Sequence, residues 1–416
     1  MNKVIFLFDL NSFFANAEIA RNPELKGKEV LIGPRNNHSI IIAATPNAKA
    51  KGIHVGMPYF KAKDISPDAV YINPDHAYYS NLSNRIFNFL KIRYTDLIEV
   101  SSIDEAYMDV TEILIREPIT EKELAQGILK DIKKHFNVTA SIGISYNKFL
   151  AKMASEFYKV DSYSTCYPSE VSTKLWSIDI EKMYGVGNAL APYLKSVGIN
   201  KIGDLARSTN DKELTRELKN HLMSYYETLI NWSNGISTNE LDLTYEEAKS
   251  ISKQITLNRF LNSESELSEL IKELSIIVGN KLKKSNLAGK NVDLLIRFGK
   301  FDSAHKSITL KTYINDESDI YDEAMNLLEE IWNFSKPVKG ARITVSSIKN
   351  FKKTLRQGNI LDADRVEVDS QKELLMELNN KLGFEGVMSS KDYENNPKYE
   401  KDNAFKSNKV KFKSWD

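Results

Sequence analysis

The sequence predicts an α+β fold made of several domains, and three observations carry this prediction. The chain has 416 residues, more than a single compact core normally encloses. Runs with the β-branched or alternating composition of strands are interleaved with runs whose apolar residues recur at helical spacing. Two adjacent carboxylates, Asp104 and Glu105, stand between two strand-like apolar runs, a place from which a sheet normally excludes charge.

That acidic segment is predicted to be the tip of a β-hairpin. Residues 97–100 and 106–110 have strand composition and flank Asp104 and Glu105. A third acid, Asp9, ends the first apolar strand of the chain. Neighbouring carboxylates repel each other unless a cation neutralises them, and several hard oxygen ligands suit Mg²⁺. Each acid taken alone also fits an ordinary turn acid or a helix cap, whereas the three together favour a metal site.

Composition and charge describe a globular protein without a global charge bias. Charged residues make up 27% and hydrophobic residues 42%, and 57 Lys and Arg against 56 Asp and Glu leave a net charge of +1. Any basic surface for nucleic acid must therefore be local. The single cysteine, Cys166, excludes an internal disulfide and fits a reducing compartment. No apolar run approaches the ~20 residues of a membrane span, so we expect a cytoplasmic protein without membrane contact.

The first 158 residues are predicted to alternate between strands and helices. Around the acids, the order strand, helix, strand-turn-strand, helix, strand, helix predicts a split βαβ sheet with helices on one face. The expected helices cover residues 13–20, 45–52, 76–94, part of 114–136, and 147–158, and the further strands cover 3–8, 29–32, 40–42 and 138–145.

Lysines stand on two of these predicted helices. The helix at 45–52 starts at a Thr cap with Pro in its first turn, so a phosphate at its amino terminus would meet Lys49. Lys148, Lys152 and Lys159 recur near helical spacing on a later helix. Lysines on a helix are also what a solvated face shows, and the residues alone leave both interpretations open.

Residues 182–205 are predicted to form a helix-hairpin-helix. Gly185 and Gly187 permit a tight turn that leaves amide N–H groups at the start of an apolar helix, with Asn188 beside them. A DNA phosphate fits there without any base being read. Pro192 is expected to kink the second helix.

A separate domain is predicted from about residue 249 to residue 349. Its expected elements are strands at 250–258, 291–299, 306–313 and 341–348 and helices at 264–284 and 318–334. Lys and Arg concentrate in the strands and loops, and Asp and Glu in the helices, so one sheet face is expected to be basic and to follow DNA phosphates. A generic α/β sandwich with lysines for solubility is the alternative. The residues selected for DNA contact in this domain are Lys253, Arg259, Arg297, Lys300, Lys306, Lys311 and Arg342.

The ordered set of motifs resembles the Y-family translesion DNA polymerases. The motifs are Asp9 with Phe13-Phe14-Ala15, then Ser102-Ile103-Asp104-Glu105-Ala106-Tyr107, then Ser141-Ile142-Gly143-Ile144-Ser145, Asn147-Lys148 and Ala151-Lys152. Their order and spacing match the family from residue 1 to about 350. Pro46 and Lys49 stand where the family carries an aromatic residue and an arginine, which favours the UmuC-like (impB/mucB/samB) branch.

The resemblance implies a right-hand polymerase with a ferredoxin-like palm, small fingers, a helix-hairpin-helix thumb and an α/β little finger. The implied boundaries are 1–18 and 77–167 for the catalytic palm, 19–76 for the fingers, 168–235 for the thumb, 236–248 for a linker, 249–350 for the little finger and 351–416 for a partly helical tail. Gln357, Ile360 and Leu361 lie where many relatives carry a sliding-clamp motif, although its terminal aromatic residue is absent here. A monomer is expected.

The resemblance also implies a DNA-directed DNA polymerase of low processivity and low fidelity, which copies damaged templates from primer-template DNA and deoxynucleoside triphosphates. Asp9, Asp104 and the carbonyl of Leu10 would hold two Mg²⁺ ions, which Mn²⁺ could replace. Glu105 would assist the ion that activates the primer 3′-hydroxyl. Phe14 corresponds to the steric gate that rejects ribonucleotides. The implied nucleotide contacts are Phe13, Phe14, Thr45, Lys49 and Lys159.

Two other interpretations remain open at this point. A nucleotidyl cyclase also carries paired carboxylates on a hairpin, but it needs no thumb. A catalytically degenerate DNA-binding accessory of the same fold would keep the domains without the chemistry. The presence of Asp9, Asp104 and Glu105 argues against the second interpretation.

Overall fold

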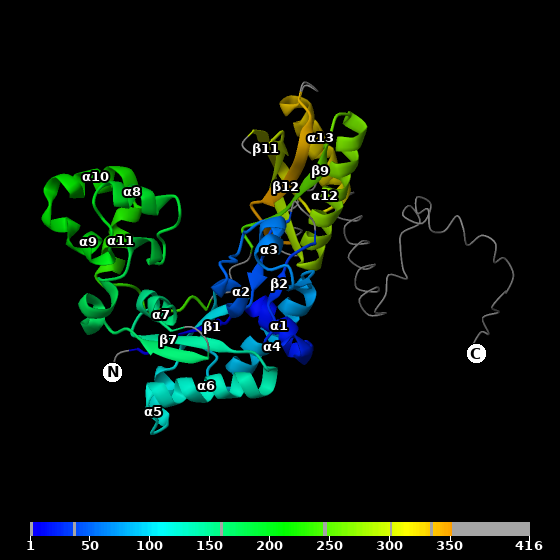
Figure 1. The fold of residues 1–416 in the computed structure, drawn as a ribbon. Coiled ribbons are helices and arrows are strands. Elements are labelled where there is room, and N and C mark those ends of the chain that lie inside the picture. Colours follow the sequence, from blue (N-terminus) through cyan, green and yellow to red (C-terminus); the bar gives the residue numbers. More distant parts are fainter. Residues whose placement is uncertain are drawn as a thin grey trace, which may run out of the picture. The chain divides into compact units, whose positions relative to one another are not determined.

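The computed structural model describes residues 3–35, 39–158, 161–243, 248–299, 302–332 and 336–351. The chain divides into two compact units, Met1–Thr244 and Tyr245–Asp416 (Figure 1). Within the described ranges, every helix is too short or too polar to cross a bilayer. The predictions for Lys159, Lys300, Gln357, Ile360 and Leu361, and for the tail after residue 351, lie outside the described residues.

The first unit is organised around a five-stranded mixed sheet, which we call the acid-bearing sheet. Its strand order is β5 (Ile98–Val100), β6 (Glu105–Asp109), β1 (Ile5–Leu10), β7 (Ala140–Ser145) and β8 (Ser162–Thr165). β1 is central, antiparallel to both neighbours and buried along its whole length. The β5–β6 hairpin confirms the predicted turn between two strands.

Three helices close one face of the acid-bearing sheet. They are α1 (Phe13–Arg21), α4 (His76–Arg93) and α6 (Glu121–Phe136), and the short α5 (Thr111–Arg116), which was not predicted separately, precedes α6. Alternate residues of β1, such as Phe6 and Phe8, share one core with Ile86 of α4 and Ile128 of α6. The apolar stripes that predicted these helices are therefore the faces that they bury.

A further helix, α7 (Lys148–Ser155), covers the opposite face, so the prediction that the helices lie on one face is wrong. Figure 1 shows α7 and α6 on opposite sides of β7. α7 connects β7 to its parallel neighbour β8, and such a crossover must pass over a face of the sheet. Gly143 permits the close approach, because a Cβ there would stand 1.9 Å from the carbonyl oxygen of Ala151.

A group of helices follows, which we call the helical lobe. It contains η2 (Pro168–Glu170), η3 (Val171–Leu175), η4 (Ile180–Lys182), α8 (Leu190–Ser196), α9 (Ile202–Arg207), η5 (Ser208–Asn210), α10 (Lys212–Leu222) and α11 (Tyr225–Ser233). These helices enclose a core that α7 shares through Phe149 and Met153. Pro192 lies in the first turn of α8, where N–H groups have no acceptor within the helix, so it interrupts no hydrogen bond of α8.

A small sheet packs beside α1. It consists of β3 (Ala43–Ala44), β2 (Val30–Ile32) and β4 (Val70–Ile72), with η1 (Pro23–Leu25), α2 (Pro46–Ala50) and α3 (Tyr59–Ile65) nearby in the chain. The strand predicted at 40–42 is wrong in position. Ile41 instead donates to Met57 O and accepts from Gly56 N, both at 2.8 Å, and it is fully buried there. The β-branched side chain of Ile41 therefore reflects burial against a loop and not pairing in the sheet.

The segment after the helical lobe lies against the acid-bearing sheet. The carbonyl of Thr238 accepts from the Lys148 amide at 3.0 Å, and the amide of Asp242 donates to the Glu99 carboxylate at 2.7 Å. Leu241 packs on the small apolar cluster between the sheet and α7. The linker predicted at 236–248 is therefore attached to the first unit over its first part.

The second unit is an antiparallel sheet with two helices on one face. The strand order is β11 (Ser303–Ile314), β10 (Leu287–Arg297), β12 (Val338–Ser346) and β9 (Ser250–Leu261), and β13 (Lys349–Asn350) pairs with β10. The helices α12 (Glu264–Lys284) and α13 (Glu317–Ile331) enclose a core in which Ile271, Val292 and Ile343 are fully buried. All the predicted elements appear in the predicted order. We call the other side of this sheet the open face.

Candidate functional site

Three acids from distant segments meet at one end of the acid-bearing sheet. Asp9 lies directly opposite Glu105 across β1 and β6. The amide of Leu10 donates to the carbonyl oxygen of Asp104 at 2.9 Å, which ties the end of β1 to the hairpin tip. Residues paired across antiparallel strands point to the same side, so the carboxylates of Asp9 and Glu105 face each other. The backbone thus brings together the acids that the sequence predicted to meet.

Ser102 shapes the hairpin tip. Its hydroxyl donates to the Asp104 carboxylate at 2.6 Å and accepts from the Glu105 amide at 3.0 Å. A serine hydroxyl that bonds to the backbone two or three residues on is a common way to hold a turn. Ser102 therefore orients both acids of the tip, a role that its place in the motif did not reveal.

Lys152 of α7 places a positive charge between the acids. Its ammonium donates to the Glu105 carboxylate, and it lies 3.9 Å from Asp9 and 3.6 Å from Glu156. Burial alone would lower the pKa of Lys152, but the hydrogen bond to Glu105 and the surrounding negative charges outweigh it and raise the pKa. Lys152 therefore stays charged and neutralises the repulsion between Asp9 and Glu105. In the sequence, Lys152 is marked by its helical spacing and by the Ala151-Lys152 motif, and neither places it between the acids.

The donor set at this end of the sheet fits a hard divalent cation. Asp9, Asp104 and Glu105 offer carboxylate oxygens, the ligands that Mg²⁺ prefers, and the position of Lys152 shows that the site attracts positive charge. Among the described residues, no group of three His, Cys, Asp or Glu side chains surrounds a single point as a ready-made metal site. Metal binding by these acids thus stays a prediction.

Lys152→Gln is expected to lower the free energy of unfolding in metal-free buffer by about 2 kcal/mol, because a charged hydrogen bond and the counter-charge of two carboxylates are lost. A divalent cation should restore most of this stability by supplying the missing positive charge. Thermal unfolding with EDTA and with Mg²⁺ measures both effects. Lys148→Gln is the matched control, since it removes the Lys148–Glu99 pair at 2.6 Å from the same helix. If Mg²⁺ raises the stability of both variants and of the wild type by the same amount, Lys152 does not occupy the place of a divalent cation between the acids.

Lys49 contacts the residue that follows the acid-bearing strand β1. Its ammonium donates to the Ser12 hydroxyl at 3.0 Å, and Ser12 follows the acid-bearing end of β1 with a left-handed backbone at φ 42°. Lys51, by contrast, pairs with Glu29 at 2.6 Å. The hydroxyl of Thr45 accepts from the Val30 amide at 3.1 Å and is buried within the small sheet. Lys49 therefore reaches the segment that connects β1 to α1.

The two phenylalanines of α1 have different surroundings. Phe13 is 3% exposed and belongs to the core, so its ring is not accessible to a nucleotide. Phe14 is half-buried, and its ring stacks on Tyr79 with centroids 4.4 Å apart. Of the pair, only the Phe14 ring can meet a ligand beside Asp9.

The turn of the predicted helix-hairpin-helix precedes α8. Gly185 has φ +87°, and a Cβ there would stand 2.3 Å from the hydroxyl oxygen of Tyr225, so the position requires glycine. The Tyr225 hydroxyl donates to Gly185 O at 3.1 Å. Space around Gly187 is open, which leaves room for a backbone contact there. Asn188 follows in the same turn.

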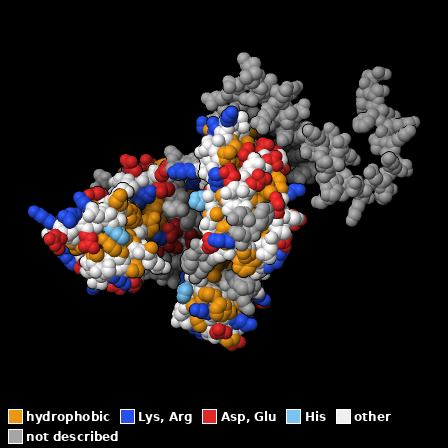
Figure 2. Space-filling view, turned by 90° about the horizontal axis from the view of Figure 1, so that it is seen from above, with side chains coloured by type: hydrophobic (Ala, Val, Ile, Leu, Met, Phe, Trp, Pro, Cys, Tyr) orange, Lys and Arg blue, Asp and Glu red, His pale blue; other side chains and the backbone are white. Residues whose placement is uncertain are grey.

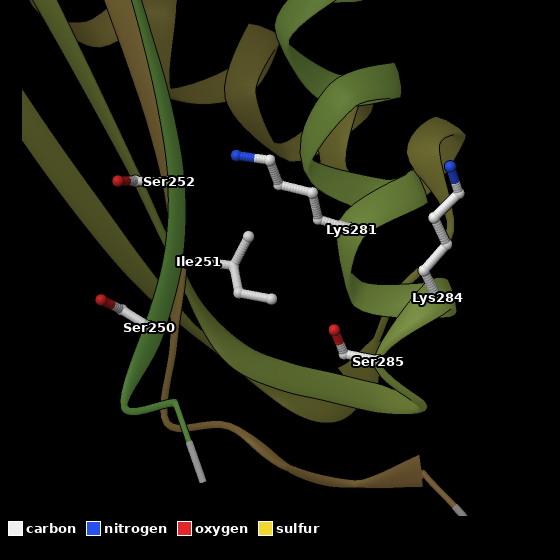
Figure 3. Close-up of a pocket in the computed structure, with 6 residues that line it drawn as sticks. All are labelled: Ser250, Ile251, Ser252, Lys281, Lys284 and Ser285. Atoms are coloured by element: carbon white, nitrogen blue, oxygen red, sulfur yellow. The ribbon is translucent and has the colours of Figure 1, made fainter. Parts of the chain in front are cut away.

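The open face of the second unit is polar and rich in hydroxyl groups. Figure 3 shows the alternation that defines it: Ile251 points towards α12, whereas Ser250 and Ser252 point to the other side of β9. Strand pairing places the following residues on that same side: Gln254 and Thr256 of β9, Arg342 and Thr344 of β12, Asn291, Asp293 and Arg297 of β10, and His305, Ser307 and Thr309 of β11. The predicted basic face is therefore wrong in composition, because few of the Lys and Arg residues of the strands point to this side.

The basic residues predicted for DNA contact are divided between the two faces. Arg297 and Arg342 lie on the open face, and the Nε atom of Arg342 is buried without a hydrogen-bond partner. Lys306 lies on the helix side and pairs with a glutamate of α13, and Lys253 shares that side. Arg259 pairs with a glutamate of α12. The exposed Lys311 lies beyond a register shift in the β10–β11 pairing.

A pocket of about 510 Å³ lies between the start of β9 and the end of α12 (Figure 3). Ser250, Ile251, Ser252, Lys281, Lys284 and Ser285 line it. These six residues include no carboxylate, so the pocket lacks the ligands of the acid-bearing sheet. On the face shown in Figure 2, Lys and Arg side chains are interspersed with Asp and Glu, in agreement with the net charge of +1.

Known proteins are similar to this chain in sequence and in fold. Family models for the impB/mucB/samB family, its C-terminal domain and the IMS family HHH motif match residues 8–156, 248–360 and 168–199. DNA polymerase IV of Oceanobacillus iheyensis is 34% identical over 400 residues, 94% of this chain and 92% of that protein. DNA polymerase IV 1 of Bacillus subtilis is 31% identical and covers 92% of this chain and 91% of its own. A solved Y-family DNA polymerase chimera of Dbh and Dpo4 has a TM-score of 0.73 at 26% identity, covering 83% of this chain and 99% of its own.

The fold and the site together define a right-hand polymerase. Within that class, the chain belongs to the impB/mucB/samB family of Y-family polymerases. The family assignment made from the sequence motifs is thus confirmed. The residue boundaries given above for palm, fingers, thumb and little finger stay predictions.

Proposed function

We propose that the chain is a DNA-directed DNA polymerase of the translesion type, which adds deoxynucleotides to a primer 3′ end on damaged or distorted templates. The observation that carries this proposal is the meeting of Asp9 with Asp104 and Glu105 beside Lys49 and Phe14. Relatives named DNA polymerase IV and a solved insertion ternary complex of Dbh DNA polymerase support the same activity. Low fidelity and low processivity are part of the proposal.

Divalent metal ions are part of polymerase chemistry, since bound ions activate the primer 3′-hydroxyl and neutralise charge on the triphosphate. We assign Asp9, Asp104 and the Leu10 carbonyl to two Mg²⁺ ions, with Mn²⁺ as a substitute, and Glu105 to the ion at the primer end. The chain's own residues prepare this site. Lys152 places a positive charge beside Asp9 and Glu105, and Ser102 holds the Asp104 carboxylate at the hairpin tip.

The triphosphate and the sugar would be held from the α1 and α2 side. Lys49 brings a positive charge to Ser12, three residues after Asp9 in the chain, and would bind phosphate as a point charge. The ring of Phe14 would occupy the space that a ribose 2′-hydroxyl needs, so ribonucleotides are rejected by a clash. The proposed nucleotide contacts of Phe13, Thr45 and Lys159 rest on the family resemblance alone.

DNA would be held by the helical lobe and by the open face of the second unit. Hydroxyl, amide and arginine groups bind phosphate oxygens without reading sequence, and the open face displays these groups. The turn with Gly185, Gly187 and Asn188 offers backbone amides for a further phosphate. Such contacts explain how a protein of net charge +1 binds DNA.

Replacing Arg297 and Arg342 together by glutamine is expected to weaken primer-template binding and to reduce the slope of log K against log salt by about 1 to 2, roughly one unit for each lost phosphate contact. Fluorescence anisotropy between about 50 and 200 mM salt measures the slope. The control replaces Lys253 and Lys306 by glutamine. These residues lie on the helix side of the same sheet, so the control removes the same charge and should keep the wild-type slope. Equal slopes for the two double variants would place DNA elsewhere.

Primer extension with each deoxynucleotide supplied singly, on undamaged and on lesion-bearing templates, tests the proposed function. Template-directed incorporation supports it. A product formed from nucleotide without primer-template would favour a cyclase, and DNA binding without Mg²⁺-dependent incorporation would favour a degenerate accessory. We further propose that the protein acts as a monomer in the cytoplasm. The sliding clamp is a candidate partner, through Gln357, Ile360 and Leu361.

A further inference from the structure

The ring of Phe14 is held by a second ring that is itself anchored. Tyr79 of α4 stacks on Phe14 with an interplanar angle of 16° and is 0% exposed, although it carries a hydroxyl group. That hydroxyl donates to the carboxylate of Glu18 at 2.7 Å. Phe14 and Glu18 are one helical turn apart on α1, so they lie on the same side of the helix. The Tyr79 side chain therefore contacts both of them, through its ring face and through its hydroxyl.

The carboxylate of Glu18 is fixed from its other side. Glu18 is 3% exposed, and Arg21 donates to both of its oxygens at 2.9 Å, a bidentate pair. Arg21 also donates to the Asp75 carboxylate at 2.9 Å, and Asp75 accepts from the Tyr78 amide at 3.0 Å where α4 begins. This chain of contacts ties α1 to α4 immediately behind the Phe14 ring.

Burying a carboxylate between two helices is unfavourable in free energy. Burial of a charge is unfavourable unless it is paired and hydrogen-bonded, and an apolar side chain would fill the same space at lower cost. What the carboxylate adds is direction, because a hydrogen bond fixes the hydroxyl of Tyr79 at one point. The Tyr79 hydroxyl is protonated at neutral pH and can donate, and burial together with the hydrogen bond to Glu18 raises its pKa further.

We propose that Glu18 is a positioning residue for sugar selection: it anchors Tyr79, and Tyr79 holds the Phe14 ring in the place where the nucleotide sugar is tested. The proposal rests on the proposed steric-gate role of Phe14. The Phe14 ring can reject a 2′-hydroxyl only if the ring does not move aside when the hydroxyl approaches. Because Phe14 stacks on Tyr79, and the Tyr79 hydroxyl is held by Glu18, the Phe14 ring has little freedom to tilt. His76 packs edge-on against Phe14 at 5.8 Å and supports the same ring from a second direction.

Tyr79→Phe and Glu18→Gln test this proposal. Tyr79→Phe keeps the stack and removes the anchor, and Glu18→Gln keeps the shape and weakens the bidentate pair with Arg21. For each variant, the preference for a deoxynucleotide over the matching ribonucleotide, as a ratio of kcat/KM values, is expected to fall about three- to tenfold. The kcat/KM for the deoxynucleotide should change less than this ratio does.

Tyr94→Phe is the matched control. Tyr94 is a partly buried tyrosine whose hydroxyl, like that of Tyr79, donates to a carboxylate: the acceptor is Asp131, at 2.8 Å. Tyr94 lies away from Phe14, between α4 and α6. Thermal unfolding should show similar losses of stability for Tyr79→Phe and Tyr94→Phe. Only Tyr79→Phe should alter the sugar preference, so a general loss of stability cannot explain the result.

Phe14→Ala, measured in the same assay, separates failure of the inference from failure of the gate. If Phe14→Ala leaves the sugar preference unchanged, the proposed role of Phe14 falls. If Phe14→Ala admits ribonucleotides while Tyr79→Phe and Tyr94→Phe have the same sugar preference, the proposed role of Glu18 is wrong and the steric-gate role of Phe14 is retained. Should Glu18→Gln fail to fold, Tyr79→Phe alone decides.

Discussion

Asp104→Ala is expected to reduce primer extension about a thousandfold or more, because bound divalent ions supply several kcal/mol of transition-state stabilisation and this acid would help to hold them. The fold should survive. Asp104 is partly exposed at the hairpin tip, and its side chain bonds to Ser102 in the turn itself. Single-turnover extension of a labelled primer measures the chemical step, and anisotropy measures primer-template binding.

A second acid provides the control for this experiment. Glu117→Ala removes an acid that pairs with Arg116 at 3.0 Å at the end of α5, and it should extend primers at the wild-type rate. Extension by Asp104→Ala within a few-fold of wild type would refute its role in metal binding. Loss of DNA binding in parallel with loss of extension would point to misfolding and not to chemistry.

Phe14→Ala is expected to raise ribonucleotide incorporation relative to deoxynucleotide incorporation about a hundredfold, since a pocket that excludes by shape loses this selectivity when the excluding ring is removed. The remaining site keeps its acids and Lys49, so deoxynucleotide addition should continue. The measurement is the ratio of kcat/KM values for a deoxynucleotide and its ribonucleotide opposite the same template base.

Phe89→Ala is the control for the loss of an aromatic ring from this region. Phe89 is a half-buried residue of α4 that packs against Phe136 at 5.5 Å, away from Phe14. It should lose comparable packing and keep its sugar selectivity. If both variants admit ribonucleotides to the same extent, the effect comes from a loosened fold and Phe14 is not the gate.

Local patterns predicted most of the elements correctly. The apolar spacing of residues 76–94 predicted a helix, and the structure has α4 at His76–Arg93. The two apolar runs around Asp104 and Glu105 predicted the β5–β6 hairpin. The error at residues 40–42 has a physical reason: β-branched residues are frequent in strands because they are often buried, and Ile41 is buried without pairing in a strand.

The acids of the candidate site could be predicted, but the groups around them could not. An acid at the end of an apolar strand is visible in the sequence. By contrast, the sequence shows Lys152 as one of several lysines on a predicted helix. Its position between Asp9 and Glu105 follows from the crossover of α7 over the sheet, which only the structure shows. Glu18 and Tyr79 are sixty-one residues apart and carry no motif that would pair them.

The sequence by itself determined the family, the order of strands and helices, and the three acids on which the proposed chemistry depends, because these follow from local periodicity and from motifs in a particular order. Only the tertiary structure decided which basic side chains share a face of the second unit and which groups support Phe14 and Asp9. The reason is that pairing register and helix crossovers set the direction of a side chain, and neither can be read from the charge of a residue or from its neighbours in the chain.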